Sequence, residues 1–202
     1  MVIPNGIDTQ KFNWEKDNTG PHIVIGMQSR IVNIKDHSTL LQAFAYLLQS
    51  GLYDKKKPVL KIAGDGDRKA QLEIFAKELG IEKQVVFTGM LSEDELVYFL
   101  QELDIYVHAS YGETMSTAIM QAMACRKAII ASDVPGINNM LIHNNTGLLV
   151  PVENATAMYE AFNLLLNDSI FSEQIATNAY SFAIKNYSNA MMFNNYKKIF
   201  IY

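Results

Sequence analysis

Residues 105–124 read IYVHASYGETMSTAIMQAMA, and they combine an apolar run, a polar turn and a helix start in direct succession. The run Ile105–Val107 predicts a strand, and a helical pattern begins near Met115. The first turn of a helix offers free backbone N–H groups and the positive end of its dipole. This order is therefore typical of an α/β site for an anionic ligand. Glu113 stands in the turn, where its carboxylate repels phosphate, so we expect it to bind a neutral, hydroxyl-rich part of a ligand.

The same alternation of apolar runs and amphipathic helical patterns extends in both directions from this stretch. A capping box at Ser92 adds a helix start between two of the strands. Such alternation predicts an α/β fold with a parallel sheet that is covered by helices on both faces. The predicted strands are 22–27, 59–63, 85–87, 105–107, 128–131 and 148–150, and the predicted helices are 36–50, 68–79, a segment after Ser92, 115–125 and 154–166.

The two ends of the chain differ from this pattern. Residues 169–201 read as helical with no strand after them, so we expect them to leave the sheet and dock elsewhere. We therefore divide the chain into a sheet domain, 1–168, and a C-terminal helical extension, 169–202. The segment Met1–Asp8 starts in the middle of an apolar run, and we expect the chain to be a piece of a longer protein.

Composition disfavours several classes of function. The net charge of -4 and the pI of about 5.6 do not point to nucleic acid. The apolar runs are too short to span a bilayer, and the single cysteine, Cys125, cannot form an internal disulfide. We therefore expect a cytoplasmic protein. His22, His37 and His143 show no grouping typical of a metal site.

Polar segments follow five of the predicted strands. In a parallel sheet of this kind ligands bind beyond the carboxyl ends of the strands, so we expect these segments to line one crevice. His108 ends a strand beside the crevice, and its position favours a packed or hydrogen-bonded histidine over a general base. The five segments are 29–35, 64–67, 89–91, 110–117 and 133–139.

Six pieces of the chain, taken in order, resemble glycosyltransferase family 4, a group of retaining sugar transferases with the GT-B fold. That fold has two Rossmann-like domains that face each other across a cleft. The resemblance covers nearly the whole chain, but only the C-terminal, donor-binding half of the family. It implies one Rossmann-like domain, with residues 169–202 crossing back to an N-terminal acceptor domain. The six pieces are Val2–Asp8, the pair Arg30 and Lys35, Leu60–Gly66, Val86–Gly89, Glu113 with position 121, and Asn145–Val150.

The resemblance implies three catalytic residues, Arg30, Lys35 and Glu113. Arg30 offers a fixed fork of donors and Lys35 a mobile charge, which suit the diphosphate of a nucleotide sugar and stabilise this leaving group without a metal. Glu113 is expected to bond hydroxyls of the transferred sugar. We expect no cofactor and no metal, and a UDP-sugar or GDP-sugar as the substrate. Further donor contacts are expected from Gly64, Gly89, Met90, Gln121 and, through backbone N–H groups at the helix start, Met115, Ser116 and Thr117.

The chain departs from the family pattern at several positions. Gln121 stands eight residues after Glu113, where the family has a second glutamate that accepts hydrogen bonds from two ribose hydroxyls. The amide oxygen of Gln121 can still accept, although a neutral acceptor is weaker than a charged one by about 1 kcal/mol. Thr114–Ser116 replaces the usual Gly-Phe-Gly, and Asn138–Asn139 occupies a place where many members have a glutamate.

The resemblance implies transfer of a hexose-type sugar to a glycan or lipid-linked acceptor, held by the N-terminal domain at the inner face of the plasma membrane. Bacterial surface polysaccharide or lipopolysaccharide synthesis is the pathway that family analogy implies. The chain by itself is expected to be inactive. Two other functions stay open: a nucleotide-sugar epimerase of GT-B architecture, and a degenerate, non-catalytic nucleotide-binding domain. A dehydrogenase is disfavoured, since no Gly-x-Gly-x-x-Gly follows the first strand.

Overall fold

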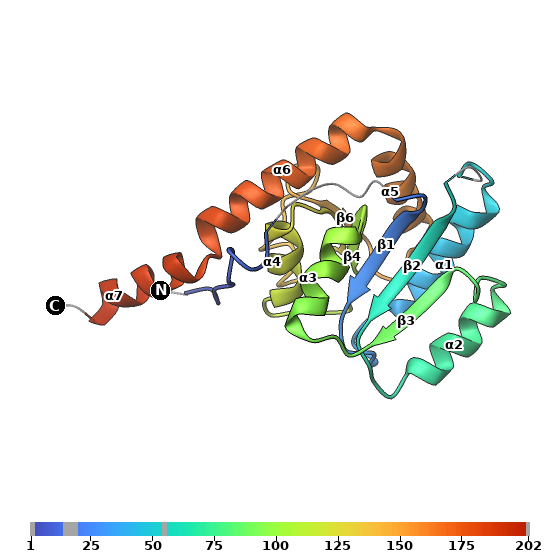
Figure 1. Ribbon diagram of the computed structural model, residues 1–202, viewed down its shortest axis with the longest axis horizontal. Helices are drawn as coiled ribbons and strands as arrows, with labels where there is room; N and C mark the ends of the chain where they lie inside the picture. The colour runs from blue at the N-terminus through green and yellow to red at the C-terminus, as the bar shows by residue number, and fades with distance from the viewer. Residues whose placement is uncertain (1–2, 14–19, 54–55, 201–202) are drawn as a thin grey trace.

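The computed structural model describes residues 3–13, 20–53 and 56–200. Within these ranges, six parallel strands form one sheet in the order β3-β2-β1-β4-β5-β6 (Figure 1). The order reverses between β1 and β4, as in a doubly wound sheet, and it confirms the predicted Rossmann-like α/β fold. The strands are β1 Ile23–Gln28, β2 Pro58–Ala63, β3 Val85–Gly89, β4 Ile105–His108, β5 Ala128–Ser132 and β6 Leu148–Val150.

The helices follow the apolar spacing of the sequence closely. The largest difference is at α4, which begins at Thr117 and not at residue 115, because the side chain of Ser116 caps it by accepting from the Ile119 N–H. The capping box predicted at Ser92 is present at the start of α3. The helices are α1 His37–Gln49, α2 Lys69–Glu78, α3 Glu93–Glu102, α4 Thr117–Ala124, α5 Ala155–Asn167, α6 Ser169–Asn186 and α7 Asn189–Phe200.

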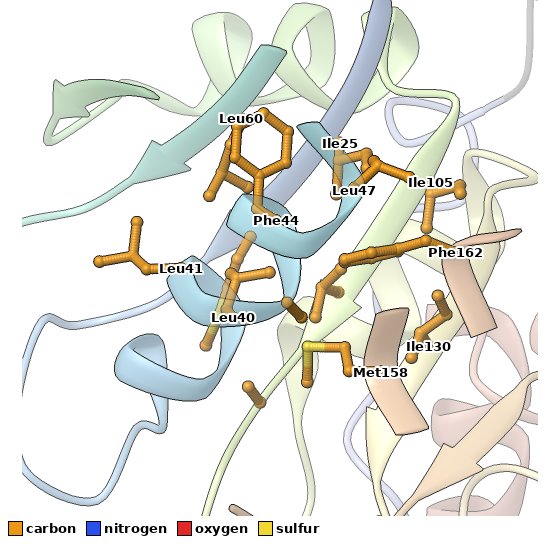
Figure 2. Packing of buried hydrophobic residues seen from close by; sticks show 14 of the residues in the cluster. Ile25, Leu40, Leu41, Phe44, Leu47, Leu60, Ile105, Ile130, Met158 and Phe162 are labelled. Atoms are coloured by element: carbon orange, nitrogen blue, oxygen red, sulfur yellow. The ribbon is translucent and has the colours of Figure 1, made fainter. Parts of the chain in front are cut away.

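One face of the sheet is covered by α1, α2 and α5. Leu40, Phe44 and Leu47 recur at helical spacing on α1 and are all buried against the strands. Figure 2 shows these side chains gathered with Ile25 of β1 and Phe162 of α5. Removal of this apolar surface from water holds α1 and α5 side by side on the sheet.

The other face is covered by α3, α4 and α6, so helices lie on both faces as predicted. Phe99 of α3, Met120 of α4 and Ala179 of α6 belong to this second buried cluster. The small side chains of α6 let it approach α4 and β5 closely. The expectation that the whole C-terminal extension leaves the sheet is therefore wrong for α6. The domain division at residue 168 stays a prediction.

The final helix, α7, has no buried residue and extends away from the sheet together with the N-terminal segment (Figure 1). Ile7 holds that segment at the junction of α6 and α7: its N–H donates to Tyr187 O at 2.8 Å, and its carbonyl accepts from Asn189 N–H at 3.0 Å. Val2, the first residue of the family-like piece Val2–Asp8, lies outside the described residues, as do residues 1 and 201–202 of the predicted domains.

Candidate functional site

The polar segments after the strands meet at the carboxyl edge of the sheet. The loop after β1 contacts the loop after β2, since Ile31 N–H donates to Asp65 O at 2.9 Å. It also contacts the loop after β4, where Tyr111 N–H donates to Ile34 O at 2.9 Å. Gly64 N–H in turn donates to Gly89 O at 2.8 Å. These backbone bonds bring the predicted site residues of separate segments into one region.

Glu113 lies at the centre of this region, where its Oε1 forms an ion pair with Lys35 Nζ. The same oxygen lies 2.9 Å from His108 Nε2. Lys35 Nζ lies 3.5 Å from Ser110 Oγ, and the backbones of these two residues form a β-bridge. Lys35 was expected to bind phosphate and Glu113 to bind sugar, whereas the structure brings the two side chains together.

The protonation of this cluster follows from burial. Burial, followed by the charges of Lys35 and His37, lowers the pKa of His108 to about 3, so the imidazole is neutral. Burial, followed by the charge of Arg30, lowers the pKa of Lys35 to about 8. The ammonium form still predominates at neutral pH, and contact with the Glu113 carboxylate favours that form. Lys35 therefore compensates the charge of Glu113 at neutral pH.

Arg30 is exposed, and its guanidinium has no hydrogen bond or ion pair with any residue in the described ranges. Its charge acts on Lys35, so the two cations are near each other. Repulsion between neighbouring cations favours an anion that binds both. Arg30 also borders a pocket of about 240 Å³, lined by Gln28, Ser29, Arg30, Ala63, Gly64, Met90, Leu91, Leu96 and Ala118.

The start of α4 is only partly available to a ligand. The N–H of Ser116 lies 3.3 Å from Met140 Sδ and its hydroxyl caps the helix, so this N–H is not free in the structure, and its contact with a donor stays a prediction. Within the described part of the chain, the N–H groups of Met115 and Thr117 have no hydrogen-bond partner. These two N–H groups are therefore available at the helix start, and their contact with a donor stays a prediction.

Gln121 contacts a second glutamine, Gln28, at the end of β1. Its Oε1 accepts from Gln28 Nε2 at 3.2 Å, and Gln28 borders the same pocket as Arg30. The other polar atom of Gln28, Oε1, is buried without a hydrogen-bond partner among the described residues. Gln28 could have been found from the sequence, because it is a polar residue at the end of an otherwise apolar strand, β1.

Three further residues shape the site and were not assigned from the sequence. Ser110 Oγ bonds the carbonyls of Ile34 and Gly112, both at 3.0 Å, which fixes the turn before Glu113. Gly136 has φ +91, and a Cβ on it would lie 1.9 Å from the Glu113 carbonyl oxygen. Met140 meets the start of α4. In the sequence, the Pro-Gly pair at 135–136 indicates a turn after β5 and could have pointed to Gly136. No sequence pattern points to Met140.

Over the described residues, no group of three or more His, Cys, Asp and Glu side chains could hold a metal ion. No helix formed by those residues is long and apolar enough to cross a membrane. Fold and site together define a doubly wound α/β domain with a carboxylate and two cations at the carboxyl edge of its sheet. That arrangement suits a ligand with both anionic and hydroxyl-bearing parts.

The sequence model of the family described as "Glycosyl transferases group 1" matches residues 8–182, so the chain belongs to this family. An uncharacterized glycosyltransferase of Methanocaldococcus jannaschii is 27% identical over 194 residues, which cover 93% of this chain and 50% of the relative. The alpha-monoglucosyldiacylglycerol synthase of Streptococcus pneumoniae is 28% identical over 220 residues, which cover 98% of this chain and 48% of the relative. The chain thus spans about half the length of these relatives. The alternative of an epimerase is not favoured by these similarities.

Solved structures agree on the fold. The C-terminal domain of a glycosyl transferase group 1 family protein from Francisella tularensis superposes with a TM-score of 0.81 at 24% identity, covering 91% of this chain and 100% of that domain. Anabaena HepE in complex with UDP-glucose superposes with a TM-score of 0.85 at 21% identity, covering 98% of this chain and 56% of HepE. The chain therefore has the fold of a C-terminal GT-B domain.

Proposed function

We propose that this chain is the nucleotide-sugar-binding part of a retaining, metal-independent glycosyltransferase that transfers a hexose-type sugar from a UDP-sugar or GDP-sugar. The observation that carries the proposal is the unpartnered guanidinium of Arg30, which lies near Lys35 and borders a pocket at the carboxyl edge of the sheet. A diphosphate in this region would meet two cations and the backbone N–H of Thr117.

Each part of such a donor has a suitable place in the site. The pocket of about 240 Å³ is mostly apolar, with Met90, Leu91 and Leu96 in its wall, and it suits the nucleobase. Gly64 and Gly89 let the backbone pass close to the ligand, and Gln121 with Gln28 suits the ribose hydroxyls. The transferred sugar then lies toward Glu113.

The chemistry would require little from protein side chains beyond charge stabilisation. The bond between the sugar and the diphosphate breaks, and Arg30 and Lys35 stabilise the negative charge that develops on the leaving group. The acceptor hydroxyl attacks the face from which the diphosphate departs, and a phosphate oxygen takes the proton of that hydroxyl. Glu113 orients the sugar through its hydroxyls and takes no part as a nucleophile.

The acceptor is proposed to be a glycan or a lipid-linked sugar, held by a second domain at the inner face of the plasma membrane. The name of the Streptococcus pneumoniae relative includes a glucosylated diacylglycerol, which supports a lipid-linked acceptor. Phe193 and Phe200 on α7 are 58% and 78% exposed, and they would pack on that domain. The chain alone is then inactive. Surface polysaccharide or lipopolysaccharide synthesis is the proposed pathway.

Calorimetry with UDP, GDP and ADP tests the donor site directly. One of these ligands should bind, and Arg30→Ala should weaken its binding by about tenfold or more, because a bond to a charged phosphate is lost. The same substitution should leave binding of the corresponding nucleoside nearly unchanged.

Lys77→Ala, which removes an exposed cation from the last turn of α2, is the control and should bind as the wild type does. Failure of all three nucleotides to bind at millimolar concentration would argue against a donor site. An equal loss for nucleotide and nucleoside would show that Arg30 does not hold the phosphates.

A further inference from the structure

We propose that His108 is a positioning residue that holds the carboxylate of Glu113 toward the sugar of the donor. The inference rests on the proposed function and adds a residue to the sugar-binding part of the site. From its sequence position, His108 was expected to be a packed or hydrogen-bonded histidine. Its hydrogen bond goes to the Glu113 carboxylate, which is the group expected to bind the sugar.

The Glu113 carboxylate is anchored through only one of its two oxygens. Oε1 contacts both Lys35 Nζ and His108 Nε2. The other oxygen, Oε2, has no hydrogen bond to any residue that the structure describes. Anchoring Oε1 fixes the plane of the carboxylate and leaves the lone pairs of Oε2 for a ligand hydroxyl.

Of the two anchors, His108 is the one that stays in place when the donor binds. Lys35 has a long, flexible side chain, and a diphosphate between it and Arg30 would share or take its hydrogen bonds. His108 is the last residue of the central strand β4, and its side chain is 1% exposed. A buried imidazole on a central strand has few alternative positions, so its contact with Glu113 persists.

The tautomer of His108 follows from its neighbours. A carboxylate only accepts hydrogen bonds, so a separation of 2.9 Å from Glu113 Oε1 requires the proton on Nε2. Nδ1 is then an acceptor, and Tyr106 Oη, at 3.2 Å, is placed to donate to it; the same hydroxyl lies 3.4 Å from the carbonyl oxygen of Gln28 and can share its proton with that oxygen. The opposite tautomer would let Nε2 accept from Lys35 Nζ at 3.4 Å, but it would put two acceptors against each other at 2.9 Å.

Binding measurements on the whole chain test the positioning role. His108→Met removes the N–H donor at similar volume, and His108→Gln keeps a donor at the reach of Nε2. The measured quantity is the ratio of two dissociation constants, UDP-glucose to UDP and GDP-mannose to GDP. For the pair that binds, His108→Met should shift this ratio against the sugar nucleotide by about tenfold, and His108→Gln should restore most of it.

His37→Gln is the matched control. His37 is also buried at this edge of the sheet, but its Nε2 contacts Ser29 Oγ at 2.9 Å and not Glu113. The control should leave the ratio as in the wild type. An unchanged ratio in His108→Met, or an equal loss for the sugar nucleotide and the bare diphosphate, would overturn the positioning role. Absence of any nucleotide binding in the wild type would instead overturn the proposed function.

A spectroscopic test uses the wild-type chain alone, so it requires neither a ligand nor a variant that folds. Long-range proton–nitrogen correlation spectra of the imidazole groups, recorded on the nitrogen-15-labelled chain at pH 7, report the tautomer of each of the four histidines. His108 should give the pattern of a neutral ring with the proton on Nε2. A proton on Nδ1 alone would overturn the inference, because Nε2 could then not donate to Glu113.

Discussion

At the scale of single residues, the site is organised around the carboxylate of Glu113. Lys35 compensates its charge, and His108 contacts the same oxygen from beneath the surface. Arg30 differs from both, because its guanidinium has no partner within the described ranges and is exposed. A compensated carboxylate beside an uncompensated cation gives one site two distinct preferences, for hydroxyl groups and for anions.

Gln121→Glu tests the residue that departs from the family pattern. A carboxylate at this position can accept from Gln28 Nε2 as the amide oxygen does, and it accepts more strongly from ribose hydroxyls. The dissociation constant of the nucleotide, measured by calorimetry, should stay the same or fall by a few-fold, in line with about 1 kcal/mol. A large loss of affinity would mean that position 121 does not face the ribose.

At the scale of elements, the stability of α4 affects the site, because the first turn of this helix follows directly on the loop of Glu113. The helix has only the eight residues Thr117–Ala124, and Ser116 caps its first turn directly after the loop of Glu113. Most of its side chains are buried between α6 and the sheet, so packing holds the helix while the cap defines where it starts. Gly136, in the loop after β5, lies close to the Glu113 carbonyl and limits the path of the loop that carries Glu113.

Ser116→Ala should lower the free energy of unfolding by about 1 kcal/mol, the usual cost of a lost N-cap. It should also weaken nucleotide binding by a few-fold, because the start of α4 frays next to Glu113. Urea unfolding measures the first effect and calorimetry the second.

Asp168→Ala is the matched control for this substitution, since Asp168 caps α6 by accepting from the Phe171 N–H at 2.9 Å and no residue of α6 borders the pocket. It should cost similar stability and leave nucleotide binding unchanged. Equal binding by the two variants would show that the start of α4 does not contribute to the site.

At the scale of the whole molecule, two hydrophobic clusters hold the helices on the two faces of one sheet. The strand order places the loops after β1 and β4 next to each other, which brings Lys35 and Glu113 into contact although they are distant in sequence. The same arrangement leaves buried histidines, His37 and His108, under the carboxyl edge.

These buried histidines predict acid-sensitive stability. Burial lowers the pKa of His37 from 6.5 to about 4. Between these values the unfolded chain binds a proton that the folded protein does not, so the free energy of unfolding decreases as the pH falls. Above pH 6.5 this contribution is absent. At pH 5 it amounts to about 2 kcal/mol for one such histidine.

Urea unfolding at pH 7 and pH 5 measures this effect, and His37→Gln should lose less stability between the two pH values than the wild type. A variant with the same pH dependence as the wild type would show that His37 becomes protonated in the folded protein.

The sequence by itself determined the strands and helices, the class of fold and the segments that carry polar side chains. Local periodicity indicates which side chains are buried, and the capping box at Ser92 indicates where a helix starts. Glu113 could be selected because it stands in one of those polar segments, whereas Arg30 could be selected because the ordered motifs resemble those of a known family. The small residues of α6 lacked an equally clear signal, so its packing on the sheet was not predicted.

Only the tertiary structure decided which of these residues meet. The contacts of Glu113 with Lys35 and His108, of Gln121 with Gln28, and of Ser116 with Met140 all join separate segments. Strand order and loop paths create these contacts, and no local pattern encodes them, because periodicity reports burial but not the partner. The role of each site residue therefore depends on the sheet that brings its loop to the others.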